Sequence, residues 1–142
     1  MYFRIDNLVS RSGISILQFI ELQIFKGTTQ LSGLQARTFA SQSYGSDFTT
    51  SRLYDGMYNC NDGGQSGYFI TYVANANPWL YVDLTNLDFD RIVMHTCSNI
   101  WTVGARVSIA TTSISDVNTI LWTSTVVAAD INTFNVPGIY VC

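Results

Sequence analysis

The sequence predicts an all-β domain, built as an antiparallel sandwich or barrel of about eight strands. The chain is rich in Thr, Tyr, Phe, Val and Ile but has one lysine and one glutamate, which is a strand composition. Short apolar runs recur at intervals of roughly ten residues, separated by turn-forming residues. The two prolines, Pro78 and Pro137, each stand where such a run begins, and there a missing N–H is tolerated.

The N-terminal half contains two predicted strands and a long irregular segment. Residues 2–9 alternate, with Phe3, Ile5 and Val9 on one side. Residues 15–26 are dense in β-branched and aromatic side chains. Their isoleucines also fit a helical period near four, but a two-residue alternation fits equally well and the neighbouring runs favour a strand. Residues 35–56 show no clear period, and a loop of that length inside a compact domain is often functional.

The C-terminal half is more regular. Residues 79–84 place Leu80, Val82 and Leu84 on one face, and Trp79 and Tyr81 on the other. Further strands are predicted at residues 67–73, 90–97, 104–111, 119–127, 132–136 and 138–142. No internal repeat is evident, which excludes propellers and solenoids. We therefore expect residues 1–142 to form one domain.

The composition restricts the partners. Charged residues make up 12% of the chain and the net charge is −3, with no basic cluster, so nucleic acid is not an expected partner. No targeting segment and no apolar run of roughly 20 residues is visible, so membrane insertion is not expected either. A surface rich in Ser, Thr, Asn and Gln is typical of extracellular and virion β proteins, and we expect one of those locations.

The three cysteines, Cys60, Cys97 and Cys142, leave at least one thiol unpaired within the chain. Cys97 is expected to be a buried core thiol. The pairing of the other two stays open.

Seven short motifs occur in an order that resembles the discoidin (F5/8 type C) family of galactose-binding-like domains. After an opening strand come IELQIF, ARTFASQSY, LYDG, PWLYVDL, RIVMHTC followed by GARVSI, and a closing GIYVC. The motif PWLYVDL, at residues 78–84, resembles the family's tryptophan-containing Val-Asp-Leu strand. The resemblance covers nearly the whole chain. It implies an eight-stranded antiparallel jelly-roll sandwich whose loops crowd at one end and bind sugars, lipid head groups or proteins.

The resemblance also implies a candidate calcium site. Some lectin-like members hold an ion near the Asp-Gly turn, and here Asp55 would supply the carboxylate and Ser66 a further oxygen. Such members usually add an acidic residue from the closing strand, which this chain lacks. The alternative is that Asp55 caps its own turn through the backbone, as Asp-Gly turns commonly do.

Sugar binding is expected at the same end of the sandwich. The His and Arg signature of the fucose-binding members is absent, because Trp101 stands where an Arg would be expected. Trp101 could instead stack on a sugar, and the sequence equally allows it to pack against the end of the sandwich. The predicted ligand-binding residues are Tyr58, Asn59, Asn61, His95 and Trp101.

Catalysis is not expected. General acid–base chemistry needs paired carboxylates or a poised histidine, and the single glutamate, Glu21, and the single histidine, His95, are expected to lie far apart. A zinc site is not expected, since His95 and the three cysteines lack close ligand spacing.

Two functions remain open. The first is a non-enzymatic recognition module that binds a glycan or a surface glycoprotein through its loops. The second is a structural building block of a virus particle or extracellular filament. Single sugar sites are weak and gain strength from multivalency, so both hypotheses predict an oligomer or a larger assembly.

Overall fold

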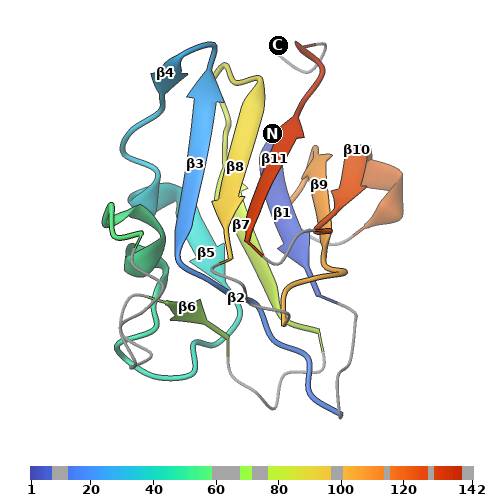
Figure 1. The fold of residues 1–142 in the computed structure, drawn as a ribbon. Helices are drawn as coiled ribbons and strands as arrows, with labels where there is room; N and C mark the ends of the chain where they lie inside the picture. Colours follow the sequence, from blue (N-terminus) through green and yellow to red (C-terminus); the bar gives the residue numbers. More distant parts are fainter. Residues whose placement is uncertain are drawn as a thin grey trace.

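The computed structural model describes residues 1–7, 13–58, 68–71, 77–96, 101–113, 116–127 and 130–138. These residues form strands joined by turns and three short 3₁₀ helices (Figure 1). The strands are β1 (Tyr2–Asp6), β2 (Gln18–Phe19), β3 (Glu21–Lys26), β4 (Thr29–Gln30), β5 (Thr38–Ala40), β6 (Phe69–Ile70), β7 (Trp79–Asp83), β8 (Arg91–His95), β9 (Arg106–Ala110), β10 (Ile120–Thr125) and β11 (Ile131–Asn135). The 3₁₀ helices are η1 (Gln35–Arg37), η2 (Thr50–Tyr54) and η3 (Val117–Thr119).

Two main sheets organise the fold. One has the strand order β10-β9-β1-β7-β5 and the other β11-β8-β3-β4, while β2 and β6 pair separately. Neighbouring strands run antiparallel throughout these described pairs. The predicted all-β, antiparallel character is therefore confirmed, and the arrangement is sandwich-like.

The core lies between the two main sheets. The five-stranded sheet contributes Phe3, Ile5, Leu80 and Val82, and the four-stranded sheet contributes its own alternate residues, such as Ile24. Burial alternates along β7, with Leu80 and Val82 inside, as the sequence predicts. Alternation leaves the odd-numbered residues of β3 on the outer face of the four-stranded sheet.

The predicted strand at residues 15–26 is divided in two. Gln18 and Phe19 pair with β6, whereas Glu21 to Phe25 pair with β8. Ile20 stands at the break, and its N–H donates to the carbonyl of His95 at 2.9 Å. The helical interpretation of this segment is wrong, because both halves are extended.

The segment at residues 35–56 is more regular than the sequence suggests. It contains η1 and η2, and between them β5, which adds to the edge of the five-stranded sheet through Thr38 opposite Val82. This segment brings η2 against β3, where the candidate site lies.

Several predicted features fall outside the described residues. They include all three cysteines, the end of the first predicted strand and the closing strand after Gly138. In the part of the chain that the structure describes, no helix has the length and apolarity needed to cross a membrane.

Candidate functional site

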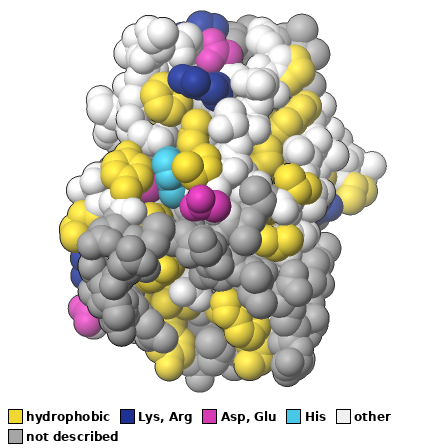
Figure 2. Space-filling view, in the orientation of Figure 1, with side chains coloured by type: hydrophobic (Ala, Val, Ile, Leu, Met, Phe, Trp, Pro, Cys, Tyr) yellow, Lys and Arg dark blue, Asp and Glu magenta, His cyan; other side chains and the backbone are white. Residues whose placement is uncertain are grey.

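Two of the predicted ligand-binding residues lie together. Tyr58, from the segment after η2, places its ring edge-on to the imidazole of His95, at the end of β8, with 4.9 Å between the ring centroids. Tyr58 remains 46% exposed. Figure 2 shows the histidine on the outer face of the four-stranded sheet, flanked by hydrophobic side chains.

Gln23 of β3 joins this pair to the neighbouring strand. Its amide nitrogen donates to the Tyr58 hydroxyl at 2.9 Å and to Oε1 of Gln30 at 3.0 Å. Its amide oxygen lies 3.0 Å from Nε2 of His95 and, being only an acceptor, fixes the proton on that nitrogen. Burial lowers the pKa of His95, an effect that Asp130 partly opposes, so the ring is neutral at pH 7.

Glu21 lies beside this network and is almost fully buried. It stands opposite His95 in the register of β3 and β8, on the outer face of the sheet, yet only 2% of its surface is exposed. The backbone N–H of Gly56 donates to its carboxyl group. Its other oxygen, Oε2, has no hydrogen-bond partner among the described residues. Burial, and secondly the charge of Asp55, raise the pKa of Glu21 to about 7.

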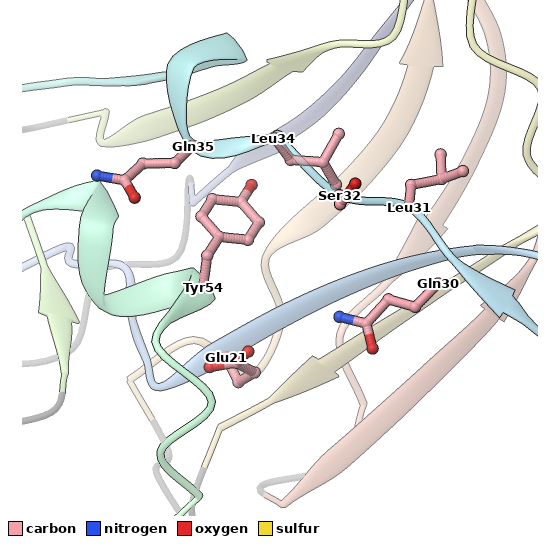
Figure 3. A pocket seen from close by; sticks show the side chains of 8 residues that line it. Glu21, Gln30, Leu31, Ser32, Leu34, Gln35 and Tyr54 are labelled. Atoms are coloured by element: carbon pink, nitrogen blue, oxygen red, sulfur yellow. The ribbon is translucent and has the colours of Figure 1, made fainter.

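A cleft of about 360 Å³ opens next to Glu21 (Figure 3). Three parts of the fold meet around it: β3, the segment from β4 to η1, and the end of η2. The lining consists of Glu21, Gln30, Leu31, Ser32, Gly33, Leu34, Gln35 and Tyr54. The cleft therefore combines a buried carboxyl group with amide and hydroxyl groups, an aromatic ring and two leucines.

Tyr54 forms a fixed wall of the cleft. The hydroxyl of Thr38 donates to the carbonyl of Leu34 at 2.7 Å, so the Tyr54 hydroxyl, 2.6 Å from Thr38, must be the donor to it. Burial raises the pKa of Tyr54 well above its ordinary value. This hydroxyl stays protonated and is committed to holding the ring in place.

Asp55 is engaged in its own turn. Its Oδ1 accepts the Met57 N–H at 2.9 Å, Arg52 lies 3.9 Å from Oδ2, and Gly56 adopts a φ of 73°. This is the geometry of the capping alternative. Among the described residues, no three His, Cys, Asp or Glu side chains are grouped as metal ligands. Ser66 lies outside those residues, so the calcium site at Asp55 and Ser66 stays a prediction.

The other predicted contacts are located differently. Trp101 lies in the turn before β9, where its carbonyl accepts the Asn7 side-chain amide at 2.8 Å, and the next residue, Thr102, bonds to both backbone groups of Gln18. The turn is thereby tied to the segment between β1 and β3. Asn59 and Asn61 lie outside the described residues.

One expectation is wrong. Glu21 and His95 were expected to lie far apart, because 73 residues separate them in sequence, but β3 and β8 are neighbours and place them directly opposite each other. The sequence signal that could have indicated this site is the alternation of Glu21 and Gln23 with Leu22 and Ile24, which puts two polar side chains on one outer strand face. Gln30, Ser32, Gln35 and Tyr54 carried no such signal.

The outer face of the five-stranded sheet is closed by its own contacts. Arg4 donates from Nε to both carboxylate oxygens of Asp6, at 2.9 and 3.0 Å, and its guanidinium lies 5.5 Å from the centroid of the Trp79 ring. Trp79 stacks on Tyr81, and Tyr81 on Phe39. The charged side chains of this face pair with one another and its rings stack, while the hydroxyl of Ser108, opposite Arg4 in β9, is buried without a hydrogen-bond partner among the described residues.

Comparison with known proteins found no match: no protein-family model fits the chain, and no curated protein or solved structure is significantly similar to it. The discoidin resemblance therefore stays a prediction.

Proposed function

We propose that this protein is a non-enzymatic recognition module that binds a glycan in the cleft beside Glu21. The observation that carries the proposal is the lining of the cleft, where Glu21, whose Oε2 has no hydrogen-bond partner in the described part of the chain, lies among amide and hydroxyl side chains next to a fixed tyrosine. Small-molecule sites are typically concave, with a few convergent polar groups on an apolar wall. A glycan offers many hydroxyl groups, and each both donates and accepts hydrogen bonds.

The neighbouring surface extends the proposed site. Tyr58, His95 and Gln23 lie next to the cleft, because Gln23 bonds to both Tyr58 and the cleft residue Gln30. A sugar chain longer than the cleft would continue over the exposed Tyr58 ring and the half-buried His95. The proposal thus keeps Tyr58 and His95 as ligand contacts and adds the cleft to them.

The finer fold assignment belongs to the same proposal. An eight-stranded jelly roll of the galactose-binding-like type would support a recognition site of this kind, and the motif order favours it. Three of the strands in the described residues have only two residues, so the strand number depends on how such strands are counted. A recognition role is also in keeping with the proposed location outside the cell or on a virion.

A glycan array tests the proposal, run once with calcium and once with a chelator. The affinity for each hit is then measured for two variants. Gln35→Ala removes an amide from the cleft, and Gln42→Ala makes the same change at an exposed position outside the lining. Loss of one hydrogen bond predicts about three- to tenfold weaker binding for the first variant and no change for the second. Absence of any glycan binding in both conditions would contradict the proposal.

A second candidate function, a building block of an assembly, is favoured by two edge strands. Among the described strands, β10 and β11 are outermost in their sheets. Leu121, Val127 and Ile131 on or beside them are exposed, Val127 by 78%. Edge strands with apolar neighbours are templates for pairing with another chain. Measuring the size of the protein in solution tests this candidate. Self-assembly that is lost in Ile131→Lys would support it, and a monomer at high concentration would contradict it.

A further inference from the structure

We propose that the ligand presents a primary ammonium group to Glu21, so that the cleft selects glycans with a free amino group over neutral or acidic ones. This inference rests on the proposed function and names the class of ligand. Glu21 is then the residue that determines specificity. The argument combines the burial of its carboxyl group, the charges around it and the groups lining the rest of the cleft.

The carboxyl group of Glu21 lacks one partner. With 2% of the residue exposed and Oε2 without a hydrogen bond among the described residues, the ionised form has lost water without full compensation. Figure 3 shows the Glu21 side chain at the open space below the Tyr54 ring. A buried carboxylate is costly unless it is paired, and an ammonium group in the cleft that Glu21 lines would supply the missing counter-charge.

The surrounding charges favour a cation there. The titratable and donor groups around Glu21 are Tyr54 from η2, Asp55 and the Gly56 N–H from the turn after it, then Tyr58, and His95 from β8. The other neighbour of β3, β4, contributes no titratable group. Asp55 adds a second negative charge, which Arg52 of η2, 3.9 Å from its Oδ2, offsets in part, and His95 is neutral at pH 7. Among the described residues, those lining the cleft include no Lys, Arg or His. A neutral hydroxyl would leave the repulsion between the two carboxylates in place, whereas an ammonium group relieves it.

The remainder of the lining fits a sugar ring that carries the amine. Gln30, Ser32 and Gln35 can exchange hydrogen bonds with ring hydroxyls, and Leu31 and Leu34 offer an apolar wall. The volume of about 360 Å³ is near the lower end of the range of small-molecule sites, roughly 300–1,000 Å³. An isolated inorganic cation would leave these side chains unused.

Two oligosaccharides that differ only in their amine test the inference. The β-1,4 tetramer of glucosamine carries free amines, and the same tetramer of N-acetylglucosamine carries none. We expect the wild-type protein to bind the amine form at least tenfold more tightly at pH 7 in calorimetric titration. The pair forms only between an ionised Glu21 and a protonated amine, so the affinity for the amine tetramer should pass through a maximum between the pKa values of these two groups.

Glu21→Gln keeps the shape of the side chain and should abolish both the preference and its pH dependence. Asp116→Asn removes the same charge beside β10, in the other sheet, and retains an acceptor for the Asn118 N–H, so it controls for general attraction of a cationic ligand. Equal binding of the two tetramers, or a preference that survives Glu21→Gln, would overturn the inference. If neither tetramer binds, the inference also fails. The glycan array then shows separately whether glycan binding itself has failed.

Discussion

At the scale of single residues, Glu21 combines two properties that rarely occur together. It occupies an outward-facing position of a sheet, and it is buried. The segment from β4 to η2 covers it and leaves a cleft at its carboxyl group. A protein that retains such an uncompensated acidic group in this position gives up some stability there, which is a common property of binding sites.

The stability of the protein should therefore depend on pH through Glu21. Its pKa is raised from 4.5 to about 7 on folding, so the folded state holds a proton that the unfolded state has lost across this range. The free energy of unfolding should fall as pH rises from 4.5 to 7 and level off above. Glu21→Gln should remove this fall and be more stable than wild type by about 2 kcal/mol at pH 8, with solvent screening allowed for. Urea unfolding of both proteins at pH 4.5, 6 and 8 measures the difference. If the free energies of unfolding of the two proteins change with pH in parallel, this prediction is wrong.

The variant Thr38→Val tests whether a hydrogen bond from Tyr54 to Thr38 holds the Tyr54 ring in place. Thr38→Val keeps the shape but removes the acceptor of the Tyr54 hydroxyl and the donor to Leu34. Leaving these buried groups without partners should cost about 1–3 kcal/mol of stability and weaken ligand binding as the wall loosens. Thr133→Val, at an exposed position of β11, is the control and should change stability by less than about 0.5 kcal/mol. Equal unfolding midpoints of the two variants would count against the proposed hydrogen bonds.

At this scale the sequence indicated part of the site. Tyr58 and His95 were predictable as candidate ligand-binding residues, because they are polar or aromatic and stand near predicted strand ends. The structure places them in contact. The pairing of Glu21 with His95 could not be selected, because it depends on which strands are neighbours. Which residue of β3 lies opposite which residue of β8 is a property of the whole sheet, and it cannot be read from the alternation of residues along one strand.

At the scale of elements, the turn after η2 determines the cleft. Asp55 accepts the Met57 N–H, Gly56 turns the chain with a positive φ, and its N–H reaches Glu21. The LYDG motif drew attention to this turn as a metal or ligand loop. The structure adds that the turn carries a donor to the buried carboxyl group.

Gly56→Ala should disturb this turn. At a φ of 73° an alanine costs about 1–2 kcal/mol, although open space surrounds the position. The strain should also move the N–H away from Glu21 and reduce ligand affinity. Gly138→Ala, which has equally open surroundings and no positive φ, should leave both properties unchanged. Thermal unfolding and ligand titration of the two variants compare these effects. Matching results for both would contradict this role of the turn.

The strands themselves were largely predictable, because alternation of buried and exposed residues is a local property. β7 and β8 lie within their predicted ranges for this reason. The break at Ile20 and the strand β5 were not predictable, since both depend on pairing with distant partners, β6 and β7. Residues 35–56 therefore looked irregular although they contain two 3₁₀ helices and a sheet edge.

At the scale of the whole molecule, the two main sheets differ in what their outer faces offer. The face of the five-stranded sheet is occupied by the Arg4–Asp6 pair and the stacked rings around Tyr81. The other sheet carries the His95 network and borders the cleft. Composition alone predicted the charge-poor, all-β character, but the difference between the faces arises only when the strands are ordered in space.

The most direct test of the central claim is a map of where a glycan binds. Amide chemical shifts of the isotope-labelled protein are followed by NMR while the best array ligand is added. We predict that the largest shifts occur at Glu21, Ser32, Gln35, Tyr54 and Gly56, with smaller ones at Tyr58 and His95. Shifts confined to the outer face of the five-stranded sheet, around Phe39 and Tyr81, would contradict the assignment of the cleft as the binding site.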